Sequence, residues 1–336
     1  MHISYLRAVS ALTLGTLLVA GCIGTGEDRV TSINAAGIVD GLVYFDSDGN
    51  REATDDDTPI ALVGIRLLFV GTQDTATRAL SDRDGLFSMP AVPVGLYQIV
   101  IDPATVPDSL LVVEIDPGVE IIASRNDTTT TAIALSFPIV TIEAARQLPP
   151  GERVFVEGVA LNARETFGDQ TVNIAGGTWA IRSTRVGTAV IFAGDSVRLL
   201  GTTSSLEGQP TLDNVTPFII TVAEVPPAIR VTTATATTAD GARLDAALVQ
   251  VRDATISDTA TVDGGLALNV NDGSGLLRIL LDEDVPFVID STYVSGSLVD
   301  ATGLLVPLPG TPATWELKPR SPADIQVNAG AIPPTQ

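Results

Sequence analysis

Short apolar runs that alternate with polar residues are the feature that most limits the fold of this chain. Val63, Ile65, Leu67 and Phe69 occupy every second position of one such run. Comparable runs follow at 97–101, 111–115 and 133–137, separated by clusters of Gly, Pro, Asp and Asn. A period of two residues places one apolar face of a strand against a core. We therefore expect an all-β fold, with a β-sandwich of six or seven short strands over residues 36–138.

Two further blocks of strand-like runs follow this first block. The second, residues 139–226, opens with a helix predicted over 141–148 and stopped by Pro149, Pro150 and Gly151. The third, residues 227–330, includes the strand-like runs TYVSGSLVD and WELKPRSPADIQV, and residues 331–336 form a predicted tail. The pair Pro226-Pro227 separates the two blocks.

The second and third blocks resemble divergent copies of one unit. Residues 172–182 (VNIAGGTWAIR) correspond to 268–280 (LNVNDGSGLLRIL), and residues 194–205 (GDSVRLLGTTSS) correspond to 290–300 (DSTYVSGSLVD). Each copy reads as a strand, a glycine-rich hairpin, a strand, and then an aspartate-led turn into another strand. Five such strands around one core predict a small β-barrel in each block.

The first 22 residues have the pattern of an export signal. Arg7 precedes an uncharged, mostly apolar stretch over 8–20, which is too short to span a membrane as a helix. Residues 19–22 (VAGC) resemble the lipobox of bacterial lipoproteins, which implies lipid attachment at Cys22 and a tether over 23–35. Ile23 in place of an aspartate favours the outer membrane or the cell surface. The alternative is an ordinary secretory signal with an incidental cysteine.

Charge and side-chain inventory restrict what the exported part can do. Without Arg7 it carries 18 basic and 40 acidic residues, a net charge of −22. This balance disfavours nucleic acid as a partner without excluding it, because basic side chains supply most of the affinity for phosphates. The single histidine, His2, lies in the predicted signal, and Cys22 is the single cysteine. We therefore expect no Ser-His-Asp triad, no Cys-His pair and no enzymatic activity.

Residues 46–57 (DSDGNREATDDD) form the densest acidic segment of the chain. Counting from Asp46, side chains that contain oxygen fall at positions one, three, five, nine and twelve, the spacing of an EF-hand-type loop. Crowded carboxylates repel one another unless a cation lies among them. The segment therefore predicts a structural calcium site, and the alternative is a solvated acidic loop between strands.

Residues 38–102 resemble the B-type (Cna-B-like, SdrD-B-like) domains of bacterial surface proteins, which are calcium-binding β-sandwiches. The resemblance rests on GLVYFDSDGN, on TPIALVGIRLLF and on SDRDGLFSMPAVPVGLYQIVI. It implies calcium ligands at Asp46, Asp48, Asn50 and Asp57. The chain departs from the family pattern with Arg51 in place of glycine, with Thr54 in place of aspartate, a role that Asp55 could take, and with the shorter Asp57 in place of glutamate. Asp82 and Asp84 are interpreted as turn residues.

The later blocks resemble the tandem OB-like domains of secreted bacterial proteins, which are often found beside extracellular nucleases. The matching segments are TIEAARQLPPGERVFVEGVA, GDSVRLLG and WELKPRSPADI. OB-folds bind strands of nucleic acid or sugar with stacking aromatic side chains. Trp179 and Arg182 are the candidate ligand contacts, and Trp315 is expected to pack against its barrel. The alternative is that both tryptophans pack inside their barrels.

Together these patterns predict a non-enzymatic, lipid-anchored surface protein with a binding or structural role toward a protein or glycan partner. The alternative is an accessory protein that holds nucleic acid or oligosaccharide for a secreted hydrolase or nuclease.

Overall fold

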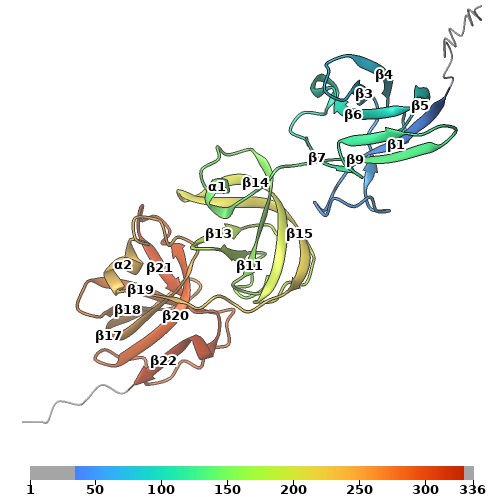
Figure 1. The fold of residues 1–336 in the computed structure, drawn as a ribbon. Coiled ribbons are helices and arrows are strands. Elements are labelled where there is room, and N and C mark those ends of the chain that lie inside the picture. Colours follow the sequence, from blue (N-terminus) through green and yellow to red (C-terminus); the bar gives the residue numbers. More distant parts are fainter. Residues whose placement is uncertain (1–34, 329–336) are drawn as a thin grey trace, which may run out of the picture.

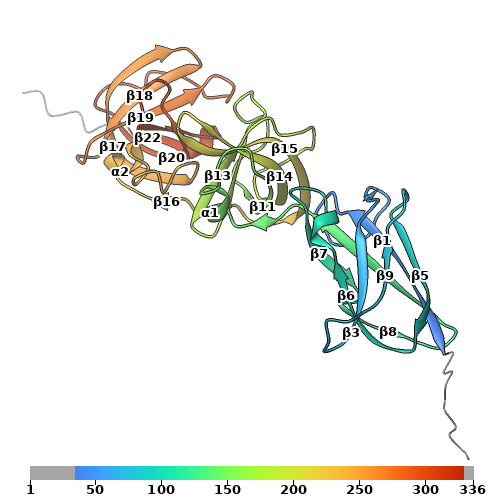
Figure 2. The same cartoon turned by 90° about the horizontal axis from the view of Figure 1, so that it is seen from above.

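The structure is a computed structural model that describes residues 35–328. Its strands form three β-units that follow one another in a row in both views (Figures 1 and 2). We call them the sandwich (residues 36–136), the first barrel (139–222) and the second barrel (229–328). The fold is all-β, a β-sandwich followed by two OB-like barrels, as the alternating sequence pattern predicts.

The sandwich packs two sheets around one apolar core. One sheet has the order β2 (Thr58–Pro59), β1 (Ala36–Phe45), β9 (Thr128–Ser136) and β7 (Leu111–Asp116), with β5 (Leu86–Pro93) also paired to β1. The other has the order β4 (Thr75–Leu80), β3 (Gly64–Phe69), β6 (Gly95–Ile101) and β8 (Glu120–Ala123). Val43, Leu67 and Ile133 are fully buried between them. β1 runs parallel to β9, so both strands end at the same side of the sandwich.

The run at 111–115 does form a strand, but it does not bury the apolar face that its alternation predicts. β7 lies at the edge of its sheet, where it pairs with β9 and shifts register between Val112 and Glu114. Leu111 is 54% exposed, whereas Ile115 is half-buried. An edge strand with such an irregularity covers only part of the core.

The first barrel closes through pairing between strands that are distant in sequence. Its sheet has the order β10 (Ile139–Val140), β11 (Arg153–Ala160), β12 (Val172–Gly176), β13 (Trp179–Ser183), β15 (Gln209–Val222) and β14 (Asp195–Leu206). Pairing of β11 with β14 closes this sheet. The predicted helix is shorter than expected: α1 spans Ile142–Ala145, with the Thr141 side chain accepting a hydrogen bond from the N–H of Ala144.

The second barrel repeats this topology. Its order is β16 (Ile229–Arg230), β17 (Leu248–Val262), β18 (Gly265–Asn271), β19 (Leu276–Asp282), β21 (Trp315–Lys318), β20 (Leu298–Pro307) and β22 (Ile325–Asn328). β17 pairs with β20, β19 runs parallel to β21, and α2 (Thr233–Thr237) is capped by Thr232 as α1 is by Thr141. The two barrels are therefore copies of one unit in topology.

One correspondence drawn from the sequence is displaced. Residues 290–297 form turns, and the strand equivalent to β14 begins only at Leu298. Asp290 accepts hydrogen bonds from the N–H and the hydroxyl of Thr292 and holds this segment in a turn. Asp and Ser side chains favour such local bonds over a strand ladder.

A buried polar cluster joins the two barrels. Asp245 of the second barrel is fully buried, and its carboxylate accepts hydrogen bonds from the indole N–H of Trp315 and from the amide of Gln209, which belongs to the first barrel. Arg146, at the end of α1, lies 3.5 Å from the same carboxylate and donates to the carbonyl of Ala242. Asn173 of the first barrel also donates to the carbonyl of Ala246. Charge pairing and hydrogen bonding thus cross the barrel interface where water is excluded.

Asp245→Ala should destabilise the chain by about 3–5 kcal/mol, because it leaves the Arg146 charge buried without its partner. Urea denaturation of residues 23–336 measures the change. Asp258→Ala, at an exposed site on β17, serves as the control and should shift the unfolding free energy by less than about 0.5 kcal/mol. Equal effects of the two variants would contradict the role of the cluster.

Candidate functional site

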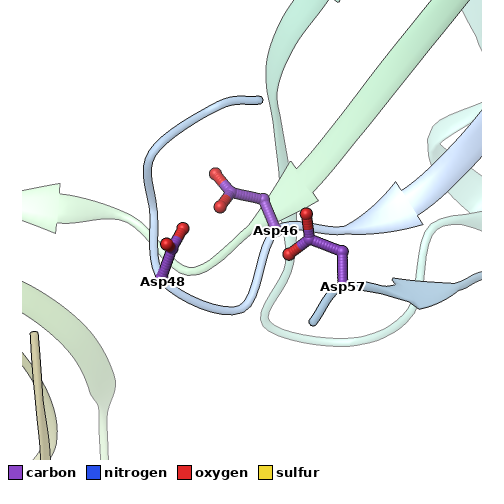
Figure 3. Close-up of side chains that lie close together, drawn as sticks. All are labelled: Asp46, Asp48 and Asp57. Atoms are coloured by element: carbon purple, nitrogen blue, oxygen red, sulfur yellow. The ribbon is translucent and has the colours of Figure 1, made fainter. Parts of the chain in front are cut away.

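Three carboxylates of the acidic segment converge at the end of β1. Oxygen atoms of Asp46, Asp48 and Asp57 all lie within 4.8 Å of one another, which is close enough for one metal ion to contact all three. Figure 3 shows the three side chains around the turn of the loop that follows β1. Within residues 35–328 this is the only such group of acidic, histidine or cysteine side chains.

Hydrogen bonds within the loop shape this group. Asp57 accepts bonds from the N–H of Ser47 and from both the N–H and the hydroxyl of Thr54. Asp48 accepts bonds from the N–H of Asn50 and from the Asn50 side-chain amide. The side-chain oxygen Oδ1 of Asn50 in turn accepts from the N–H of Glu52. The loop therefore brings together the carboxylates of Asp46, Asp48 and Asp57, and the Asn50 side chain bonds to Asp48 within it.

Asp46 is the most unusual of these side chains, because it is fully buried and only partly bonded. One of its oxygens, Oδ2, accepts a hydrogen bond from the N–H of Arg51, and the other, Oδ1, is buried with no hydrogen-bond partner in the described part of the chain. Burial raises the pKa of Asp46 to about 6, helped by the neighbouring Asp48 carboxylate. Burial, followed by the charge of Asp46, raises the pKa of Tyr44 to about 12.

Arg51 and Thr54, two positions at which the loop departs from the B-type pattern, can be assessed from their backbone and hydrogen bonds. Arg51 has a left-handed backbone with φ of +68°, a conformation that favours glycine, and its side chain lies 3.9 Å from Glu114 at the surface. Gly49 is also left-handed, with φ of +73°. Thr54 acts as a hydrogen-bond donor to Asp57. Asp82 accepts bonds from the N–H groups of Asp84 and Leu86, the bonding of a turn residue.

The acidic loop lies at the joint between the sandwich and the first barrel. Arg198 of β14 donates a hydrogen bond of 3.0 Å to the backbone carbonyl of Asp48, and its guanidinium also pairs with Glu157 of β11 at 2.8 Å. Only Phe137 and Pro138 connect β9 to β10. The Phe137 ring packs edge-on against Phe45, which directly precedes Asp46. The first barrel therefore contacts one of the candidate metal ligands, Asp48, directly through its backbone carbonyl.

The structure does not bring Trp179 and Arg182 together. Trp179 is half-buried at the start of β13 and lines a cleft of about 620 Å³ between the β12–β13 hairpin and the segment 139–143. Arg182 lines a different and smaller pocket of about 140 Å³ at the interface of the two barrels, where Asp169 lies 3.7 Å from its guanidinium. Trp315 is buried at the same interface and bonded to Asp245.

Sequence reasoning missed the residues that connect the units. Arg146, Arg198 and Asp245 lie in runs of ordinary composition, and their partners are distant in the sequence. No local pattern marks them.

Other predicted features lie outside the described residues. Cys22 and the export signal precede residue 35. Among the described residues, no helix is long and apolar enough to cross a membrane.

No family model matches the chain, and no curated protein matches it. Among solved structures it is similar to the minor pilin GBS52 of Streptococcus agalactiae, with 15% identity over 31% of this chain and 45% of the pilin and a TM-score of 0.23. A murine DNA-binding protein bound to double-stranded DNA aligns with 13% identity over 54% of this chain and 99% of that chain, with a TM-score of 0.29.

The TIE protein of Bacillus anthracis aligns with 9% identity over 80% of this chain and 45% of that chain, with a TM-score of 0.24. The chain thus spans less than half the length of the pilin and of the TIE protein. Likenesses at these identities and TM-scores carry no information on what the chain binds.

The raised pKa of Asp46 predicts how the stability of the metal-free protein depends on pH. Its folded pKa of about 6 lies above its ordinary value of 3.8, so the folded state binds this proton more tightly than the unfolded state does. The contribution of Asp46 to stability is therefore present at low pH and is lost as the pH rises through about 6. Asp46→Asn, which is neutral and of similar shape, should be more stable than the wild type at pH 7.5, and the difference should shrink as the pH falls below about 6 and close only below the ordinary value of 3.8.

Urea denaturation in the presence of a chelator, at intervals of pH from below 3.8 up to 7.5, measures this difference. Other buried carboxylates, such as Asp245, titrate equally in both proteins and cancel in the comparison. A difference between the two proteins that does not change with pH would show that Asp46 is ionised throughout.

Proposed function

We propose that this chain is a non-enzymatic, lipid-anchored surface protein in which a calcium-stiffened sandwich holds out two barrels for binding. The sequence supports the anchor through the lipobox at residues 19–22 and the lack of catalytic side chains through its single histidine and single cysteine. The observation that carries the proposal is the position of the acidic loop at the joint between the sandwich and the first barrel.

The buried carboxylate of Asp46 supports a cation at this loop. A charge without a partner in a buried position is expensive, and proteins pair such charges, neutralise them or place them on a metal. Here the carboxylates of Asp48 and Asp57 have oxygens within 4.8 Å of an oxygen of Asp46, and they add repulsion. Calcium prefers oxygen ligands and tolerates irregular geometry, and this donor set consists of oxygens alone.

A cation at this loop would act on the joint itself. Ligation of Asp46 and Asp48 would fix the backbone between them, and the carbonyl of Asp48 accepts the hydrogen bond from Arg198. The Ser136 hydroxyl donates a bond of 2.6 Å to the carbonyl of Asp46, so the last residue of β9 is also tied to the loop. The two-residue connection leaves little freedom beyond these contacts. We propose that calcium makes the sandwich and the first barrel one stiff unit.

Calcium titration of residues 23–336 by calorimetry should give one binding event with a dissociation constant of about 10⁻⁴–10⁻³ M, the range of extracellular calcium modules. Asp46→Ala and Asp48→Ala should each abolish the heat of binding. Asp84→Ala removes an exposed carboxylate from another loop of the sandwich and should leave the heat unchanged. An unchanged heat in Asp46→Ala would refute the ligand assignment.

Small-angle scattering tests the effect of calcium on shape. The wild type should give a flexible, averaged profile with chelator and an extended, rigid profile with calcium. Arg198→Ala should still bind calcium but remain flexible, because it loses the bond to the Asp48 carbonyl. Arg125→Ala, an exposed arginine of the sandwich with no contact to the barrel, is the matched control and should behave as the wild type. Identical profiles with and without calcium would contradict the stiffening role.

A further inference from the structure

A cleft beside Trp179 is lined by residues of the first barrel. The segment 139–143 forms one wall, the β12–β13 hairpin at 176–179 forms the other, and Glu157 of β11 lies between them. Its volume of about 620 Å³ falls within the ordinary range of ligand sites. Figure 1 shows α1, β11 and β13, the elements around this cleft.

Trp179 differs from the other tryptophan of the chain in what its indole does. The N–H of Trp315 donates to the buried Asp245, so that ring serves the barrel interface. Trp179 is only half-buried, and its N–H has no acceptor among residues 35–328. The Trp179 ring packs in part against the core of the first barrel and also lines the cleft, where it offers apolar surface.

The charged side chains that line the cleft are both carboxylates. Glu143 is exposed and forms no ion pair with any described residue, and Glu157 is held in position by Arg198. Lining residues Thr141 and Thr178 add hydroxyl groups, and no lysine or arginine lines the cleft. Such a lining repels phosphates and other anions but accepts hydrogen bonds from hydroxyl groups, because an ionised carboxylate has only acceptor oxygens.

The Trp179 ring already interacts with one cation of the protein. The guanidinium of Arg146 lies 5.5 Å from the centre of the Trp179 ring, and Arg146 does not line the cleft. The negative potential of the ring is thus already engaged by one cation, which weakens its attraction for a second. Contact between the indole and the C–H face of a sugar ring does not depend on that potential to the same degree.

We propose that the Trp179 cleft is a binding site for a neutral oligosaccharide. One sugar ring packs on the indole of Trp179, and its hydroxyl groups donate hydrogen bonds to Glu143 and Glu157. The inference rests on the proposed role of the barrels in binding and assigns that role a ligand class and a site.

The test is a glycan array of neutral and acidic oligosaccharides probed with residues 23–336, followed by calorimetry with neutral hexasaccharides of glucose, mannose and N-acetylglucosamine. Trp179→Ala should weaken binding at least about tenfold, the loss typical of truncating an aromatic anchor. Glu143→Gln should weaken it without touching the core. Trp179→Phe keeps an aromatic face and should fall between the wild type and Trp179→Ala.

Two variants on the same barrel serve as controls. Phe192→Ala removes an aromatic side chain that is 63% exposed away from the cleft, and Glu152→Gln removes an exposed carboxylate elsewhere on the barrel. Both should bind sugar as the wild type does. Each variant is checked for folding by circular dichroism and by the calcium heat of the sandwich, because none of these substitutions changes a candidate calcium ligand.

A parallel titration with single-stranded DNA at low and high salt distinguishes the competing ligand class. Salt-sensitive DNA binding that is lost in Trp179→Ala would overturn the proposal, as would binding of acidic glycans alone or of no glycan. Equal binding by Trp179→Ala and the wild type would place the sugar elsewhere and would also overturn it. None of these results affects the proposed stiffening by calcium, which fails only if the calorimetry and scattering of the sandwich joint fail.

Discussion

A fully buried aspartate stands at each of the two joints between the β-units, and the two are compensated in different ways. Asp245, between the barrels, has two hydrogen-bond donors on Oδ1, and its Oδ2, which has no hydrogen-bond partner among the described residues, lies 3.5 Å from the counter-charge of Arg146. Asp46, beside the joint of the sandwich and the first barrel, has the carboxylates of Asp48 and Asp57 within 4.8 Å and one oxygen without a hydrogen-bond partner among the described residues. Burial raises the pKa of both groups. The same physical cost is therefore met by the protein itself at one joint and left unmet at the other.

Because of this difference, the interface between the two barrels and the joint between the sandwich and the first barrel should differ in stiffness. The barrel interface contains its own counter-charge and also bonds Asn173 and Arg320 of opposite barrels to backbone carbonyls across it. The sandwich joint has aromatic packing, a short connection and the single bond from Arg198, all beside a group that favours a cation. Under the proposal, the joint between the two barrels is always stiff, whereas the joint between the sandwich and the first barrel is stiff only when calcium is bound.

Local patterns in the sequence predicted the parts of the molecule that depend on neighbouring residues. The alternation at 63–69 predicted β3, the acidic spacing placed Asp46, Asp48 and Asp57 in one loop, and the glycines before Trp179 predicted a hairpin. The sequence also predicted a barrel in each later block, but not which strands close it, because the pairs β11–β14 and β17–β20 join segments that are distant in the sequence. Nor could the role of Asp245 be predicted, because its partners lie between 36 and 99 residues away and its own segment is alanine-rich. Interactions of this kind become visible only when the strands are assembled.

The two tryptophans show how assembly decides which of two similar side chains is available for binding. Both are the first residue of a strand, and the sequence predicted Trp179 as a ligand contact and Trp315 as packed against its barrel. In the second barrel, the indole N–H of Trp315 donates to the buried Asp245. In the first barrel the indole of Trp179 is half-buried, and Arg146, which compensates Asp245, lies over its ring. Arg146 thus contacts both Asp245 at the barrel interface and the Trp179 ring that we assign to sugar binding. The packing of the two barrels and the position of the Trp179 ring therefore depend on the same side chain.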